Sequence, residues 1–264
     1  MIDTGRIVAV TGASSGIGLA AARLFRDRGD KVYCLSRTDP KEQGITFIHT
    51  DVTDEASVNA AFGAIGKAEG RIDVLLSNAG IGVSGAAECT TMQDAKRQLD
   101  VNFFGLHACV RAAVPLMRAH GGTILATSSV AAVFAIPFQA FYSASKFAVN
   151  ALVLALANEL KPFNIRVAAI MPGDVKTGFT GARIKAEDDD NYGQSVEKSV
   201  AVMEHDEQNG MGPEMIAKRF VALSLKKHPK VLSTVGLQYK FFCFLGKVLP
   251  IRLQNFIVGK MYIK

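Results

Sequence analysis

The sequence contains no tryptophan, and its four cysteines are scattered singly, with no CxxC pair and no Cys/His cluster. Zinc sites and disulfide frameworks need cysteines at characteristic spacings, so this pattern predicts reduced thiols and no metal site. The first residues also lack the charged stretch and apolar run of a secretory signal. We therefore expect a cytoplasmic protein.

Acidic residues are missing after Glu214, although ten lysines and arginines follow it. Of the 30 basic and 24 acidic residues in the chain, residues 1–214 hold 20 basic and all 24 acidic ones, a net charge of −4, and the last fifty residues carry +10. Such a basic and apolar end favours an anionic membrane surface or an acidic ligand. No motif that reads nucleic acid accompanies the charge, so we expect no nucleic-acid partner.

Short apolar runs alternate with segments of helical length along most of the 264 residues. The runs have the composition of buried parallel strands and cover residues 6–11, 31–36, 45–51, 73–80, 122–129 and 164–173. Helices are expected at about 15–28, 54–69, 91–119 and 140–161. This alternation predicts an α/β fold, a single Rossmann-fold domain over residues 1–264, whose doubly wound parallel sheet has helices on both faces. Only TDPKEQG separates Arg37 from Ile45, which is too short for a crossover helix.

The first expected strand runs directly into TGASSGIG at residues 11–18, and a helix follows. Glycines at positions 12, 16 and 18 permit a tight turn, close approach of the backbone to a phosphate, and close helix packing. The free N–H groups at the helix N-terminus favour a pyrophosphate. The pattern therefore predicts a dinucleotide site, although an ordinary strand-to-helix loop is the alternative.

Tyr142 and Lys146 stand four residues apart at the start of an apolar helical pattern, and Ser129 precedes Tyr142 by thirteen residues. Residues i and i+4 share one face of a helix, so the phenol and the ammonium would face the same point. A nearby positive charge stabilises a phenolate, whose pKa is ordinarily near ~10. The pair could also be an exposed helical pair without function.

Several separated motifs together resemble the short-chain dehydrogenase/reductase family, in particular its NADP-preferring hydroxysteroid- and retinol-dehydrogenase-like members. In chain order they are TGxxxGxG, SNAG at 77–80, Asn102 in DVNFFG, Ser129, YxxxK at 142–146 and PGDVKT at 172–177. The resemblance covers about residues 6–177. Ser77 stands where the family often has asparagine and Ala132 where it often has glycine, which affects local packing rather than the catalytic groups.

The resemblance implies four catalytic residues. Tyr142 would exchange a proton with the substrate oxygen, and Lys146 together with an oxidised nicotinamide would lower the pKa of Tyr142. Ser129 would bind the same oxygen, so that Ser129 and Tyr142 contact the substrate, and Asn102 would hold a water that connects Lys146 to solvent. Ser128 is the competing serine, but only Ser129 has the spacing of the family pattern.

The resemblance also implies contacts to the coenzyme from the glycine-rich turn, the ends of later strands and the PGDVKT segment. The residues are Gly12, Ser14, Ser15, Gly16, Ile17, Gly18, Ser36, Arg37, Asp51, Val52, Asn78, Ala79, Gly80, Tyr142, Lys146, Val175 and Thr177. NAD users carry an acidic residue after the second strand, where this chain has Ser36 followed by Arg37. A hydroxyl and a guanidinium favour the 2′-phosphate of NADP(H), although Arg37 could instead be a solvated loop charge.

Two segments beyond these motifs concern the substrate. Residues 178–212 are polar and follow the sixth strand, so we expect a mobile substrate lid there, with a solvated turn at the acidic run 187–190. The C-terminal extension, residues 236–264, is apolar but interrupted by charges and Pro250, so it cannot span a membrane. It could be a wall of an apolar substrate pocket, a subunit interface, or a membrane foot.

The sequence therefore favours an NADP(H)-dependent oxidoreductase that interconverts a ketone and a secondary alcohol on a hydrophobic substrate such as a steroid, retinoid or lipid. A 3-oxoacyl carrier-protein reductase is one alternative, and a non-catalytic NADP(H)-binding sensor or scaffold is another. The resemblance implies a homodimer or homotetramer built on the helices at 91–119 and 140–161. The protein would be cytoplasmic, with possible peripheral contact to a membrane through the C-terminal extension.

Overall fold

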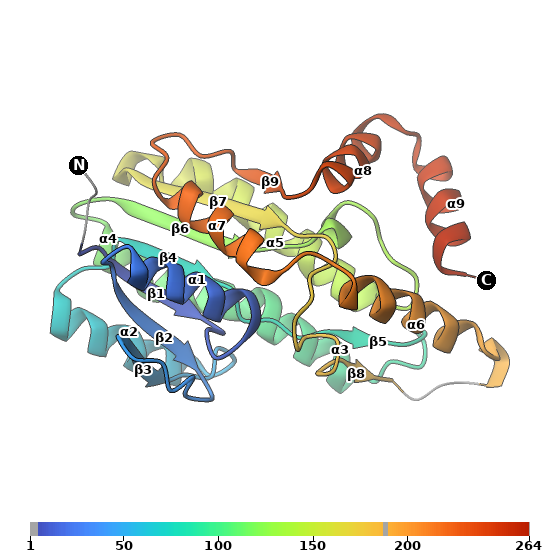
Figure 1. The fold of residues 1–264 in the computed structure, drawn as a ribbon, viewed down its shortest axis with the longest axis horizontal. Helices are drawn as coiled ribbons and strands as arrows, with labels where there is room; N and C mark the ends of the chain where they lie inside the picture. Colours follow the sequence, from blue (N-terminus) through green and yellow to red (C-terminus); the bar gives the residue numbers. More distant parts are fainter. Residues whose placement is uncertain (1–4, 187–189, 264) are drawn as a thin grey trace.

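The fold is built on a seven-stranded parallel sheet with the strand order β3-β2-β1-β4-β6-β7-β9 (Figure 1). The structure is a computed structural model that describes residues 5–186 and 190–263. The strands of this sheet are β1 (Ile7–Thr11), β2 (Lys31–Ser36), β3 (Ile45–His49), β4 (Val74–Ser77), β6 (Gly122–Thr127), β7 (Ile165–Met171) and β9 (Leu232–Thr234). The predicted doubly wound α/β fold is confirmed.

Helices cover both faces of the sheet because its central strands are apolar on both sides. In β1, Ile7 and Ala9 belong to one core cluster, whereas Val8 and Val10 belong to the other. Alternate residues of a strand point to opposite faces, so a fully apolar strand buries both. One face packs against α2 (Glu55–Glu69), α4 (Gly105–Met117) and α5 (Ala140–Glu159), and the other packs against α1 (Gly16–Asp27) and α7 (Pro213–Ser224).

The helix expected over residues 91–119 has the right extent but is not α-helical throughout. It consists of α3 (Met92–Leu99), a π-helical segment (Asp100–Phe104) and α4. The wider turn lies where the Asn102 side chain accepts a hydrogen bond from the backbone N–H of Ile81 and donates one to its carbonyl. Such π segments occur mostly at functional sites. The short connection between β2 and β3 contains no helix in the described structure, as predicted.

Three strands were not predicted from the sequence. β9 closes one edge of the main sheet, and β5 (Val83–Ser84) pairs with β8 (Ile184–Lys185) in a separate two-stranded sheet. All three have only two or three residues, which is too short for a periodic apolar pattern. The β5–β8 pair attaches the expected lid segment to the chain after β4.

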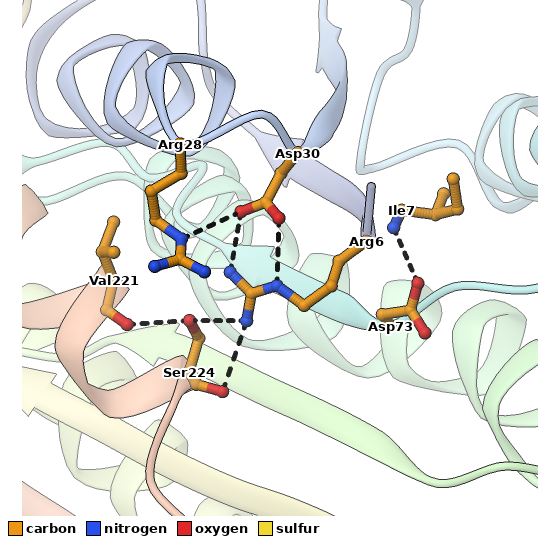
Figure 2. A network of polar contacts seen from close by, with 7 residues as sticks. All are labelled: Arg6, Ile7, Arg28, Asp30, Asp73, Val221 and Ser224. Atoms are coloured by element: carbon orange, nitrogen blue, oxygen red, sulfur yellow. Dashed lines mark hydrogen bonds and ion pairs between the residues drawn. The ribbon is translucent and has the colours of Figure 1, made fainter. Parts of the chain in front are cut away.

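A buried ion pair holds the amino ends of β1 and β2, at the opposite end of the strands from the glycine-rich turn (Figure 2). The Arg6 guanidinium donates two hydrogen bonds to Asp30, at 2.7 and 3.1 Å, and a third to the Ser224 hydroxyl at 3.1 Å. Both partners of the ion pair are buried. The network joins the starts of β1 and β2 to the end of α7, so it fixes the sheet at the end opposite the site.

The last two helices, α8 (Leu237–Val248) and α9 (Ile251–Tyr262), lie at the same end of the molecule as α6 (Ser195–Gln208) and β8 (Figure 1). The expected lid, 178–212, contains β8 and α6, and most of its acidic run, residues 187–189, lies outside the described residues. By length and composition one described helix, α5, could span a membrane. It packs against the sheet through Val149 and Val153, as a core helix does.

Candidate active site

The carboxyl ends of the central strands meet at a large cavity of about 1570 Å³. β1, β4, β6 and β7 are neighbours in the sheet, so the residues that follow them lie side by side. The chain reverses its strand order between β1 and β4, and ligands of open α/β sheets bind at such a switch point.

Nearly every predicted site residue lines this one cavity. They are Gly12, Ser14, Ser15, Gly16, Ile17, Ser36, Arg37, Asp51, Val52, Asn78, Ala79, Gly80, Ser129, Tyr142, Lys146, Val175 and Thr177. Gly18 and Asn102 lie behind the cavity wall instead. Residues as far apart in the chain as Gly12 and Thr177 are thus brought into one place by the topology of the sheet.

The glycine-rich turn has room for a phosphate only because three of its residues lack a side chain. Gly12 and Gly16 have φ values of 64° and 55°, which favour glycine. A Cβ on Gly12 would lie 2.8 Å from the Ala79 Cα, and one on Gly18 would lie 2.4 Å from the Gly12 carbonyl oxygen. The turn leads into the N-terminus of α1, whose N-cap Ser15 makes no side-chain capping bond. These features fit a dinucleotide pyrophosphate.

Thr11 and Thr127 hold the neighbouring strand end in place, and sequence reasoning missed both. The Thr11 hydroxyl accepts hydrogen bonds from the backbone N–H groups of Asn78 and Ala79, at 3.0 and 3.1 Å. The Asn78 side chain donates to the Gly12 carbonyl and accepts from the Thr127 hydroxyl. The only signal in the sequence was that each threonine ends an apolar run.

The far end of the nucleotide crevice lies at the ends of β2 and β3. Arg37 is exposed and lines the cavity, whereas the buried Ser36 hydroxyl donates to the Thr38 carbonyl at 2.7 Å. Burial tends to raise the pKa of Asp51, but hydrogen bonds from the Thr53 N–H and hydroxyl and the charge of Arg37 hold it below its ordinary value. The carboxylate of Asp51 therefore remains ionised, with Arg37 close enough to attract it.

Tyr142, Ser129 and Lys146 come together at the centre of the cavity. α5 carries Tyr142 and Lys146 on one face, and Ser129 follows β6. Tyr142 and Ser129 line the same part of the cavity, and the Ser129 hydroxyl acts to lower the pKa of Tyr142. The Lys146 ammonium lies 5.6 Å from the centre of the Tyr142 ring and donates to the Thr127 carbonyl at 2.9 Å.

Burial controls the titration of both residues on α5. It raises the pKa of Tyr142 to about 12, although the Ser129 hydroxyl acts the other way, and it lowers the pKa of Lys146 to about 8. The lowering of the Tyr142 pKa that we expect concerns Lys146 together with a bound oxidised nicotinamide, and it stays a prediction. At neutral pH Tyr142 is protonated and can act as an acid.

Asn102 lies behind this group. Its side-chain amide donates to the Ser145 hydroxyl at 3.0 Å, and its side-chain oxygen accepts from the Ile81 N–H at 2.9 Å. A Cβ on Gly80 would lie 3.3 Å from the Asn102 oxygen and 3.7 Å from the Lys146 nitrogen, so Asn102 and Lys146 flank the same glycine. Asn102 thus helps to position the segment that begins at Gly80.

The competing serine, Ser128, faces another way. Its hydroxyl donates to the Asn150 side chain at 2.7 Å and lies 3.5 Å from the Lys146 carbonyl. Ser129, in contrast, accepts from the Ala131 N–H and contacts Tyr142. The geometry therefore offers Ser129, and not Ser128, to a ligand above Tyr142.

The PGDVKT segment closes the cavity on the side of the glycine-rich turn. Thr177 packs beside Gly16, where an added Cβ would lie 3.4 Å from the Thr177 Cβ. Its hydroxyl accepts from the Phe179 N–H, and the buried Val175 pairs with Met211 through a β-bridge. A bound nicotinamide end would lie between this segment and Tyr142.

A sequence model of the short chain dehydrogenase family matches residues 6–188. The protein is a short-chain dehydrogenase/reductase. It is 39% identical over 236 residues to the 3-ketodihydrosphingosine reductase of Bacteroides thetaiotaomicron, which covers 88% of each chain. It is 39% identical over 192 residues to the rat estradiol 17-beta-dehydrogenase 1, covering 66% of this chain and 55% of that one. A short-chain dehydrogenase from Streptomyces avermitilis has the same fold, with a TM-score of 0.86 at 27% identity over 98% of both chains.

Membership of this family makes the protein an oxidoreductase that uses a nicotinamide cofactor, and solved relatives include complexes with NAD and with a derivative of NADP. Family members act on small-molecule substrates and are usually oligomeric. In this dehydrogenase the cavity continues beyond Tyr142 and has a further wall there.

That wall is acidic near Tyr142 and apolar farther out. Three carboxylates line it: Asp174, Asp206 and Glu207. Asp174 accepts a hydrogen bond from the Tyr239 hydroxyl at 2.7 Å, and Glu207 pairs with the buried Arg183. Burial, with the charges of Asp206 and Glu207, raises the pKa of Asp174, although the bond from Tyr239 opposes the shift. The outer lining comes from α8 and α9: Phe242, Leu245, Leu249, Ile257, Val258, Met261 and Tyr262.

Proposed function

We propose that this dehydrogenase is an NADP(H)-dependent enzyme that interconverts a ketone and a secondary alcohol on a long apolar molecule. The observation that carries the proposal is that Tyr142, Ser129 and Lys146 line one cavity between the glycine-rich turn and the apolar helices α8 and α9. The nucleotide motif and an apolar pocket therefore meet at a proton donor.

The residues of the chain have distinct tasks in ketone reduction. The nicotinamide, when bound, supplies the hydride to the carbonyl carbon. Ser129 holds the carbonyl oxygen by a hydrogen bond, and Tyr142 gives its proton to that oxygen. The Lys146 ammonium stabilises the phenolate that Tyr142 becomes, and the Thr127 carbonyl keeps the ammonium in place. Asn102 positions the Gly80 segment beside Lys146.

NADP(H) is the proposed coenzyme because Arg37 is exposed in the cavity at the end of β2, where an acidic residue would repel a 2′-phosphate. Arg37→Asp removes the guanidinium and adds a negative charge, so we expect kcat/KM with NADPH to fall by about 100-fold and the preference to move towards NADH. Steady-state kinetics with both coenzymes measures this. A strong preference of the unchanged enzyme for NADH would contradict the assignment.

The acidic part of the cavity favours an amino ketone over a steroid or retinoid. A primary ammonium next to the reacting carbonyl would pair with Asp174, Asp206 or Glu207, whereas a steroid offers them no charge. The similarity to a 3-ketodihydrosphingosine reductase points the same way, because a sphingoid base carries an amine and a long alkyl chain. We propose a long-chain amino ketone as the substrate, with its alkyl chain between α8 and α9.

Two other functions receive less support. A carrier-protein reductase would dock an acidic partner at the cavity mouth, where the outer wall of this cavity is apolar. A non-catalytic NADP(H) sensor has no need of a proton donor, yet Tyr142, Ser129 and Lys146 are assembled here.

A cytoplasmic location is consistent with the four cysteines, which are present as thiols.

Replacement of the proton donor tests the proposal. Tyr142→Phe keeps the ring but removes the hydroxyl, so reduction of a long-chain amino ketone by NADPH should fall by at least about 1000-fold. NADPH binding, followed by fluorescence titration, should change less than about threefold. Full activity of the variant would overturn the mechanism, and absence of turnover of any ketone by the unchanged protein would overturn the proposed function.

A further inference from the structure

The outer face of α8 is an exposed apolar stripe. Leu237, Phe241, Phe244 and Val248 are 83%, 57%, 58% and 55% exposed, and they follow one another at intervals of four, three and four residues. This spacing places them on a single face of the helix. Surface helices of globular proteins turn such a face inward, so α8 is oriented for a partner outside the chain.

In α9, too, large apolar side chains are exposed, and one of the two buried residues is polar. Its buried residues are Gln254 and Val258, whereas Ile251, Leu253 and Phe256 are 68%, 43% and 61% exposed. The Gln254 side chain donates hydrogen bonds to the Gly246 and Leu249 carbonyls, at 3.1 and 2.7 Å. These bonds lock α9 against the end of α8. The outward apolar side chains are therefore a fixed property of the two helices, which we call the α8–α9 pair (residues 237–262).

Basic residues surround this apolar surface. Lys240 and Lys247 each stand three residues after a member of the α8 stripe, and Arg252 and Lys260 are exposed on α9. No acidic residue follows Glu214 in the sequence. Lysine and arginine place their alkyl stems along apolar surface while their charges reach outward, so the pattern suits a layer that is apolar inside and negative outside.

The opposite side of the α8–α9 pair faces the active-site cavity. Leu245, Ile257 and Met261 line the cavity from these two helices and Leu249 lines it from the link between them, while Leu237, at the start of the stripe, also reaches the cavity edge. Figure 1 shows α8 and α9 at the end of the molecule farthest from the N-terminus, next to α6. One pair of helices thus separates the reacting centre from an apolar and basic outer surface.

We propose that the α8–α9 pair docks on an anionic lipid bilayer, with its apolar stripe at the boundary between headgroups and acyl chains, and that the substrate enters the cavity from the bilayer through this pair. The docking follows from the surface alone, whereas the delivery of substrate rests on the proposed function. Buried aromatic and aliphatic area supplies the affinity, and the basic residues select negative lipids.

A second copy of the chain fits this surface less well. Most homodimers are twofold symmetric and place a patch against itself, which would bring Lys240, Lys247, Arg252 and Lys260 against the same residues. Like charges at the rim of an interface oppose association. A bilayer with acidic headgroups provides the opposite charge.

Vesicle binding by the full chain, without coenzyme or substrate, tests the docking. We expect the protein to sediment with vesicles that contain about 30 mol% phosphatidylglycerol, and to bind pure phosphatidylcholine at least about tenfold more weakly. The double variant Phe241→Ser/Phe244→Ser should lose at least about tenfold in affinity. The matched variant Met92→Ser/Leu225→Ser, which removes two exposed apolar side chains elsewhere, should bind as the unchanged protein does.

The result that overturns the proposal is equal sedimentation with and without anionic vesicles, or binding that the stripe variant leaves intact. Loss of an oligomer in the stripe variant, measured by light scattering, with no vesicle binding by either protein, would assign the surface to a second copy and also overturn it. A short water-soluble ketone keeps the two proposals separate. Its turnover without vesicle binding would remove only the docking, and vesicle binding without any turnover would remove only the proposed function.

Discussion

At the scale of a single residue, Lys146 combines a proposed role in the reaction with a cost to the stability of the fold. The side chain is buried, and its ammonium has a hydrogen bond to the Thr127 carbonyl but no ion pair among the described residues. Burial therefore lowers its pKa from 10.5 to about 8. Below pH 8 the folded protein contains a buried charge that weakens the fold, and in the proposed mechanism this charge stabilises the phenolate of Tyr142.

Lys146→Met should therefore abolish turnover and stabilise the protein. An unfolded lysine holds its proton up to about pH 10.5 and the folded one only up to about pH 8, so the unfolded state binds more protons between these values. The stability of the unchanged enzyme should rise with pH across this window. The variant should gain on the order of 1–3 kcal/mol near pH 7 and little above pH 10.5.

Denaturant unfolding of both proteins from pH 6 to pH 10.5 measures this difference. Lys146→Gln serves as a control with a neutral polar side chain that can still donate to Thr127. It should also be inactive and should likewise lack the rise in stability between pH 8 and pH 10.5. A variant less stable than the unchanged enzyme at pH 7 would show that the ammonium has a net stabilising role instead.

At this scale sequence reasoning predicted the residues that belong to the motifs. It missed the residues whose side chains hold the motif segments in place. The YxxxK spacing and the thirteen residues from Ser129 to Tyr142 indicated groups that the structure does bring close to one another. Thr11, Thr127 and Tyr239 could not be recognised, because their partners are set by strand order and by a helix more than sixty residues away. A side chain that bonds across the fold leaves no local pattern.

At the scale of elements, α8 is attached to the coenzyme site by one tyrosine. The Tyr239 hydroxyl donates to the Asp174 carboxylate at 2.7 Å and accepts from the Asp174 N–H at 3.1 Å. The ring lies where a Cβ on Gly173 would approach within 2.0 Å, so this glycine leaves space for it. The start of the C-terminal pair is therefore bonded directly to the PGDVKT segment.

Tyr239→Phe should loosen both segments. It leaves the partly buried Asp174 carboxyl without its partner, so we expect the free energy of unfolding to fall by about 1–2 kcal/mol and KM for the coenzyme to rise about three- to tenfold. Tyr33→Phe is the matched control, since the Tyr33 hydroxyl also bonds a carboxylate, that of Glu69, but far from the cavity. It should lower stability without changing KM. Equal effects of the two variants on KM would contradict a link between α8 and the site.

Elements with a strong apolar period were predicted well, and elements set by tertiary contacts were not. Six strands of the main sheet follow from short runs of apolar residues in the sequence, and the helices follow from the longer segments between these runs. The π-helical turn at Asp100–Phe104 depends on the side chain of Asn102 meeting the backbone of Ile81, and β5, β8 and β9 are too short to have a pattern. The lid and C-terminal subdivisions of the chain stay predictions.

At the scale of the whole molecule, exposed apolar side chains of the described residues are grouped on two helical surfaces, besides single ones such as Met92 and Leu225. One is the α8–α9 pair, and the other is the outer face of α5 with the adjoining end of the π-helical segment. There Phe104, Phe147 and Leu154 are 53%, 44% and 47% exposed, and Ala144 and Ala151 continue the stripe on α5. The exposed apolar residues of this second surface are spaced as on one face of a helix, and few basic residues lie among them. Such a surface suits contact between two copies of the chain.

We therefore expect a homodimer or homotetramer that uses the face of α5, and Phe147→Glu/Leu154→Glu should convert it to monomers. Two carboxylates would be buried at a symmetric interface opposite their own copies, which is strongly unfavourable. Light scattering after gel filtration gives the mass of each form. The control Met92→Glu places the same charge on an exposed apolar residue of α3 and should leave the assembly unchanged. A monomeric unchanged enzyme, or a double variant that keeps its mass, would contradict this arrangement, and loss of the oligomer in the Phe241→Ser/Phe244→Ser variant instead would move the interface to α8.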